Sequence, residues 1–164
     1  MPKYFLDTSA LAKVYRKEIG SDFVDRILSD PGSQSIISRL TIVEMESVFA
    51  LKMRTGEIDR QSVLIARRRL DADLGRRRLL VAAVNDEHFR TARQLLFKYG
   101  AVAALRALDA LQLSVALGLE RAGLVAVFVA ADRILCRAAT LEGLVVTDPE
   151  QTASILISDP REKN

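Results

Sequence analysis

Short apolar runs alternate with helical segments along most of the chain, and two of these runs end on an aspartate. Residues 4–6 lead into Asp7, and residues 127–131 lead into Asp132. Apolar runs of this length are typical of buried strands, and strands that alternate with helices pair in parallel through right-handed crossovers. The pattern therefore predicts a three-layer α/β/α domain with a central parallel sheet of about five strands.

Periodicity and turn residues place the individual elements. We expect helices over residues 9–16, 21–28, 41–54, 59–74, 86–98, 105–121 and 132–140, and strands over residues 3–6, 35–37, 79–84, 125–130 and 144–146. Thr41 and Glu44 have the spacing of a capping box at the start of one helix, and Leu108 belongs to an apolar stripe on another. One domain over residues 1–148 and a weakly determined tail over residues 149–164 are expected.

Composition restricts the class of protein. A chain of 164 residues with 49% hydrophobic content can bury a single core. The one cysteine, Cys136, cannot form an intramolecular disulfide, and no cluster of cysteines and histidines resembles a zinc site, so a cytoplasmic protein is expected. No signal peptide is recognisable and no apolar stretch approaches the roughly 20 residues of a membrane span, so we expect no membrane partner.

Basic residues are clustered although the formal net charge is only +3. Two arginine triplets, 67–69 and 76–78, would permit contact with nucleic acid. Asp71 and Asp73 lie between them, so a solvated helix face explains the same pattern. The triplets alone do not decide between the two interpretations.

Four carboxylates are candidates for a functional site. The carboxyl ends of parallel strands meet at one edge of a sheet, which brings Asp7 and Asp132 together. Asp109 is the only acid between Gly100 and Gly118, and an ionised carboxylate in such apolar surroundings costs several kcal/mol unless it is paired or bound to a cation. Glu44 lies on a helix that follows another strand.

Each of these acids also has an ordinary structural explanation. Arg106, three residues before Asp109, could form a surface ion pair with it. The capping box accounts for Glu44, and spacing alone does not choose between Glu44 and the nearby Glu46. Asp7 and Asp132 could be helix caps.

Taken together, the four acids predict a metal site. Four like charges in one cleft repel each other and require a cation, and a set of oxygen ligands without cysteine or histidine selects Mg²⁺ or Mn²⁺. Such a site suits hydrolysis of phosphodiester bonds.

At these residues the chain resembles the PIN-domain nucleases, and among them the VapC-type toxins of bacterial toxin–antitoxin pairs. The matching segments, in order along the chain, are residues 4–13, 38–44, 105–113 and 130–132, with 142–144 behind them. The resemblance implies a Mg²⁺- or Mn²⁺-dependent endoribonuclease that acts on RNA. It also implies a homodimer that pairs with a cognate antitoxin, and the helices over residues 41–54 and 59–74 are candidates for the dimer face.

The resemblance also assigns roles to single residues. It implies that Asp7, Glu44, Asp109 and Asp132 are the catalytic and metal-site carboxylates. Asp7 and Asp132 would ligate the metal directly, and Glu44 and Asp109 would ligate it or hold metal-bound waters. Thr8 or Ser9 would orient a carboxylate or a water.

This chain departs from the family pattern at two positions. It has Ala130 where many relatives have Ser or Thr, so a supporting hydroxyl is missing there. It also has Gln112 where relatives often have His, a position that is not one of the acids.

The sequence also bears on two other functions. A phosphatase that uses Asp7 as nucleophile is disfavoured, because Ser9 stands where a second aspartate would be needed and no lysine follows a late strand. A catalytically inactive PIN-like module that binds RNA or a protein partner stays open, although the presence of all four acids speaks against it.

Overall fold

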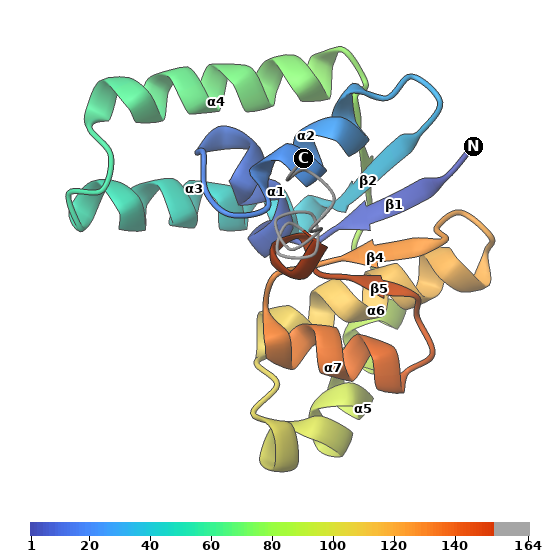
Figure 1. Cartoon of the computed structure of the whole chain (residues 1–164). Helices are drawn as coiled ribbons and strands as arrows, with labels where there is room; N and C mark the ends of the chain where they lie inside the picture. The colour runs from blue at the N-terminus through green and yellow to red at the C-terminus, as the bar shows by residue number, and fades with distance from the viewer. Residues whose placement is uncertain (153–164) are drawn as a thin grey trace, which may run out of the picture.

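Five parallel strands form one sheet, in the order β3-β2-β1-β4-β5 (Figure 1). The structure is a computed structural model that describes residues 1–152. The strands are β1 (Lys3–Leu6), β2 (Gln34–Ser38), β3 (Leu79–Ala82), β4 (Val127–Val129) and β5 (Val146–Thr147). The predicted sheet is therefore confirmed.

Helices cover both faces of the sheet. They are α1 (Thr8–Tyr15), α2 (Ser21–Ser29), α3 (Arg39–Arg54), α4 (Arg60–Gly75), α5 (Asp86–Ala103), α6 (Ala107–Arg121) and α7 (Arg133–Leu141). Successive strand residues point to opposite faces. Phe5 and Phe128 pack with α5, α6 and α7, whereas Leu6 and Val129 pack with the other four helices. This arrangement confirms the three-layer α/β/α fold.

The order of the strands places β1 at the centre of the sheet. The chain adds β2 and β3 on one side of β1 and then returns to add β4 and β5 on the other side. Leu6 and Val129 are neighbours in the resulting register. The carboxyl ends of β1 and β4 therefore lie side by side at the point where the strand order reverses, which is where open α/β sheets bind their ligands.

The expected capping box of Thr41 and Glu44 is wrong. Helix α3 begins at Arg39, and the hydroxyl of Ser38 accepts a hydrogen bond from the Thr41 amide at 3.3 Å. Ser38 is both the last residue of β2 and the cap of α3, so the strand passes directly into the helix. Thr41 and Glu44 are thereby free for other contacts.

Two expectations about the central helices are also wrong. Helix α5 does not end at Gly100 but continues to Ala103, which packs against the buried core. Helix α6 begins at Ala107 rather than at residue 105, and the expected apolar stripe does not face the core at every position. Leu108 is 47% exposed, and the fully buried positions include Ala110 and Leu113.

The remaining differences concern the ends of elements. The strands expected over residues 79–84 and 125–130 are shorter, and the last strand is Val146–Thr147 rather than 144–146. Most of the tail expected over residues 149–164 lies outside the described residues. Within residues 1–152, the helices are too short or too polar to cross a membrane.

Candidate active site at the carboxyl edge of the sheet

Asp7 lies where β1 passes into α1, and it is only 5% exposed. Its carboxylate Oδ2 accepts hydrogen bonds from the Ser9 amide at 2.9 Å and the Ser9 hydroxyl at 2.7 Å. Burial raises the pKa of Asp7 to about 6, against the lowering effect of the Ser9 hydrogen bonds, and the carboxylates of Glu44 and Asp109 raise it further. Asp7 is therefore a buried acid whose ionised form is disfavoured by burial and by two neighbouring carboxylates.

Ser9 connects the ends of the two central strands. Its hydroxyl donates to Asp7 and accepts a hydrogen bond from the Ala131 amide at 2.9 Å. The Asp7 amide donates to the carbonyl of Val129, also at 2.9 Å. The position of the Asp7 carboxylate is thus fixed from both β1 and β4.

Glu44 is held by a buried polar network whose centre is Gln112. The Glu44 Oε2 atom accepts hydrogen bonds from the Thr8 hydroxyl at 2.7 Å and from Gln112 Nε2 at 2.5 Å. Gln112 Nε2 also donates to the hydroxyls of Thr41 at 2.9 Å and Thr8 at 3.1 Å. The Ser38 hydroxyl donates to Gln112 Oε1 at 2.7 Å. The residues that begin α1 and α3 are therefore tied to α6.

Sequence reasoning gave Gln112 little weight, although it is only 1% exposed and satisfies both ends of its amide. A signal was present in the sequence. Gln112 is a polar residue three positions after Asp109, so the two share one face of α6. A buried polar residue on the same face as a candidate acid indicates a network that supports the site.

Asp109 and Asp132 are bridged by one arginine. Arg106 Nε donates to Asp109 Oδ2 at 2.9 Å, and Nη2 donates to Asp109 Oδ1 at 3.3 Å and to Asp132 Oδ2 at 3.2 Å. Asp132 also caps α7 through its other carboxylate oxygen, which accepts from the Leu135 amide at 2.9 Å. The ion pair with Arg106 expected as an alternative is therefore present, and it extends to a second acid.

The structure also distinguishes the two candidate glutamates, Glu44 and Glu46. Glu46 is exposed and forms an ion pair with Arg67 at 2.9 Å, away from the other acids. Glu44, Asp7, Asp109 and Asp132 come from α3, β1, α6 and the start of α7, and their contacts join them at one edge of the sheet. Of the two glutamates, Glu44 is the one that lies with the aspartates.

Several arginines of the two triplets have structural contacts. Arg69 donates to the Val14 carbonyl at 2.8 Å and its guanidinium lies 5.6 Å from the centre of the Tyr15 ring. Arg78 pairs with the buried Asp73 at 3.0 Å. For these arginines the contacts favour a structural role over contact with nucleic acid.

A divalent cation fits the site by the chemistry of its donors. The four acids offer only oxygen, as Mg²⁺ and Mn²⁺ prefer. Within residues 1–152, however, no three acidic, histidine or cysteine side chains are already arranged to hold a metal ion. The contacts of Glu44 with Gln112, and of Asp109 and Asp132 with Arg106, explain this arrangement, so metal binding would require some of these hydrogen bonds to be exchanged.

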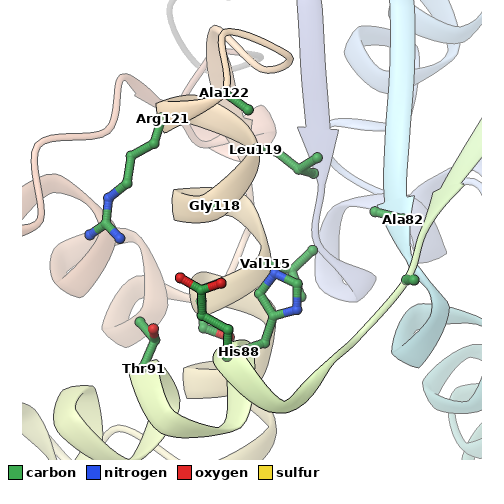
Figure 2. A pocket seen from close by; sticks show the side chains of 11 residues that line it. Ala82, His88, Thr91, Val115, Gly118, Leu119, Arg121 and Ala122 are labelled. Atoms are coloured by element: carbon green, nitrogen blue, oxygen red, sulfur yellow. The ribbon is translucent and has the colours of Figure 1, made fainter.

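A separate cavity of about 550 Å³ lies between α5 and α6 and contains none of the four acids (Figure 2). His88, Thr91, Ser114 and Arg121 are among its lining residues. Burial lowers the pKa of His88, and its Nδ1 accepts a hydrogen bond from the Asn85 amide at 3.0 Å. His88 therefore has a role in starting α5.

The sequence model of the PIN domain family matches residues 4–141, which is most of the chain. The matched segment includes all four acids and the residues that support them. The chain therefore belongs to the PIN domain family. No curated protein sequence matches the chain.

Solved structures with the same fold include proteins with the VapC name. PAE2754 from Pyrobaculum aerophilum is 20% identical, with a TM-score of 0.59 over 96% of this chain and 97% of that chain. VapBC2 from Rickettsia felis, bound to a DNA fragment from its promoter, is 16% identical with a TM-score of 0.61 over 89% and 98%. Mycobacterium tuberculosis VapC20, a sarcin-ricin loop cleaving toxin, is 17% identical with a TM-score of 0.59 over 87% and 96%. At these identities the likeness establishes the fold.

Proposed function

We propose that this PIN-domain protein is a Mg²⁺- or Mn²⁺-dependent endoribonuclease that hydrolyses RNA phosphodiester bonds. The observation that carries the proposal is the buried Asp7 carboxylate, whose pKa is raised to about 6 with Glu44 and Asp109 close enough to contribute. A structural acid at this position needs no acidic neighbours. A buried carboxylate with two further carboxylates beside it is expected where a cation binds.

The proposed roles follow from the resemblance of these residues to the PIN-domain nucleases. Asp7 and Asp132 would be direct metal ligands, and Asp109 and Glu44 would be ligands or would hold metal-bound waters. A bound Mg²⁺ or Mn²⁺ supplies polarisation of the phosphoryl oxygen and lowers the pKa of the attacking water. Ser9 keeps Asp7 in place, and Thr8 and Gln112 keep the Glu44 carboxylate directed at the edge of the sheet.

We further propose that the protein is the toxin of a cytoplasmic toxin–antitoxin pair and forms a homodimer. The family membership and the likeness to VapBC2 and VapC20 support this role. A cognate antitoxin would bind the protein and suppress cleavage of RNA. Coexpression with a candidate antitoxin, followed by copurification and loss of cleavage in the complex, tests the partner.

Cleavage of a mixed pool of folded cellular RNAs tests the enzyme. The reaction is run with Mg²⁺, with EDTA, and with Asp7→Asn protein in Mg²⁺, after circular dichroism has shown that the variant is folded. Discrete cuts that disappear in both controls are the expected result. Cuts that persist in EDTA or with Asp7→Asn would contradict a metal-dependent mechanism at these acids.

One observation favours a second candidate, a PIN-like module that binds RNA or protein without cleaving. Arg106 forms ion pairs with Asp109 and Asp132, and within the described residues the acids are not arranged to hold a metal ion. This candidate predicts that Mn²⁺ does not bind with measurable heat. Calorimetric titration of Mn²⁺ into wild type, with Asp7→Asn as control, separates the two functions.

A further inference from the structure

Arg106 stands at the mouth of the acidic site. It precedes the first residue of α6, and the chain reaches it through Ala104, whose φ of 55° turns the backbone sharply after α5. The Arg106 side chain is 71% exposed, yet three of its N–H groups are directed at Asp109 and Asp132. The guanidinium therefore lies between the acids and the solvent.

Only some of the N–H donors of the Arg106 guanidinium form hydrogen bonds within the described residues. A guanidinium has five N–H donors, and the contacts of Arg106 use one on Nε and both on Nη2. Within the described residues, Nη1 makes no hydrogen bond. A guanidinium keeps its positive charge in proteins. Two donors on a fixed cation thus remain available at the surface of the site.

The contacts of Arg106 with the buried Asp109 compensate that carboxylate and account for Nε and one donor of Nη2. They do not account for Nη1, which has no partner within the described residues. An RNA phosphate must approach four carboxylates of its own sign, and a planar guanidinium is the side chain that best bridges a phosphate oxygen.

Two basic residues of α1 and its end, Lys13 and Arg16, have acidic partners of their own. Lys13 is buried and pairs with Glu18 at 3.3 Å and with Glu150 at 2.7 Å, and Arg16 pairs with Glu57. Both side chains are therefore engaged in ion pairs with residues of the protein itself.

We propose that Arg106 is a substrate-binding residue, which keeps its contact with Asp109 and presents Nη1 to a phosphate of the RNA next to the bond that is cut. This inference rests on the proposed function. When a cation binds Asp132, the single contact from Nη2 is given up and the two contacts with Asp109 remain.

The test is RNA binding without cleavage. A labelled single-stranded RNA is titrated in EDTA and in Ca²⁺, an oxygen-preferring cation, with fluorescence anisotropy at several KCl concentrations. Wild type is compared with Arg106→Met and Arg106→Lys. Arg26→Met is the matched control, because Arg26 is an exposed arginine on α2 and its loss changes the net charge equally. Melting curves confirm that each variant is folded.

We expect Arg106→Met to bind RNA about tenfold more weakly and to lower the slope of log K against log[KCl] by about 0.7, the value of one phosphate contact to a single strand. Arg106→Lys should recover the slope but only part of the affinity, and Arg26→Met should change neither. Unchanged affinity and slope in Arg106→Met, with wild type binding RNA normally, would overturn the inference and leave the proposed function intact.

Metal binding supplies a second measurement. Arg106→Met should bind Mn²⁺ as tightly as wild type or more tightly, since a competing cation has been removed. Weaker Mn²⁺ binding would assign Arg106 to ordering the carboxylates and would overturn its role as an RNA contact. If wild type neither binds nor cleaves RNA, the proposed function itself fails.

Discussion

Asp7 makes the metal-free protein sensitive to pH. Its pKa is about 6 in the folded protein and near 3.8 in the unfolded chain, because burial disfavours the ionised form. The folded state therefore holds the proton more tightly, and ionisation of Asp7 destabilises it increasingly as the pH rises from about 4 to above 6, by about 3 kcal/mol in full.

Asp7→Asn should remove this cost. The amide oxygen can still accept from Ser9, so we expect the variant to be more stable than wild type by up to about 3 kcal/mol near pH 8 in EDTA, with no difference below about pH 4. Urea unfolding across this pH range measures the effect. A constant difference between the two proteins at every pH would show that Asp7 does not titrate as the burial implies.

Gln112 should be a costly residue to replace. Gln112→Leu keeps the volume but removes the hydrogen bonds of the amide to Ser38, Thr41 and Glu44 in a buried region. Glu44 keeps its contact with Thr8, and Ser38 and Thr41 keep their contact with each other, so we expect a loss of about 1 to 3 kcal/mol. Gln94→Leu on the exposed side of α5 is the control and should change stability by less than about 0.5 kcal/mol. If both variants unfold at the same urea concentration as wild type, the network does not stabilise the fold.

Asp7 and Asp132 could be found from sequence because each directly follows a strand, and the topology of parallel sheets brings such ends together. The supporting residues could not be found in the same way. Gln112 meets Thr8 across 104 positions, and Arg106 meets Asp132 across 26. Such contacts depend on the rotation of α6 about its axis, which periodicity does not define to within one residue.

Helix α5 has a strong local start. The Asn85 side chain accepts from the amides of Glu87 and His88 at 3.1 and 3.2 Å, and His88 accepts from the Asn85 amide in return. Asn85→Ala should therefore cost about 1 kcal/mol, whereas Asn85→Asp should be close to wild type. Thermal unfolding measures the difference, and RNA cleavage below the melting temperature should be unchanged because the cap lies outside the acidic site. Equal stability of the alanine variant would mean that water replaces the cap.

The types and order of the elements were predictable, and their ends were not. Alternation of short apolar runs with amphipathic segments is a local property of the chain, so the sheet and the seven helices follow from it. The ends depend on contacts between distant residues. Gly100 could end a helix locally, but α5 continues to Ala103, which packs against the core. Ser38 caps α3 because it is the last residue of β2, which leads directly into the helix.

Divalent cations should stabilise the whole protein if the four acids bind them. At about 100 times the dissociation constant, Mg²⁺ or Mn²⁺ should add about 2.7 kcal/mol, which corresponds to a rise in Tm of about 5 to 10 °C. Asp7→Asn should respond much less, and differential scanning fluorimetry records both. A melting temperature of wild type that does not move with either cation would count against the metal site.

The surfaces of α3 and α4 carry apolar side chains that fit the proposed homodimer. The exposed members are Val43, Leu51 and Met53 on α3 and Leu64 and Ile65 on α4. Ile65→Asp should shift the protein to monomers in sedimentation velocity, because a carboxylate would be desolvated in the interface. Phe97→Asp on α5, where Phe97 is 95% exposed, is the comparison. Dissociation by Phe97→Asp but not by Ile65→Asp would move the interface to α5.

The reversal of strand order beside β1 has a consequence for synthesis of the chain. Asp7 and Glu44 emerge early from the ribosome, but Asp109 and Asp132 come from the second half of the sequence, and β4 pairs with β1 only after that part has been made. A partly synthesised chain thus carries only two of the four acids and lacks β4, which completes the edge of the sheet at the site. A nuclease built in this way would have no complete site while most of its own chain is still being translated.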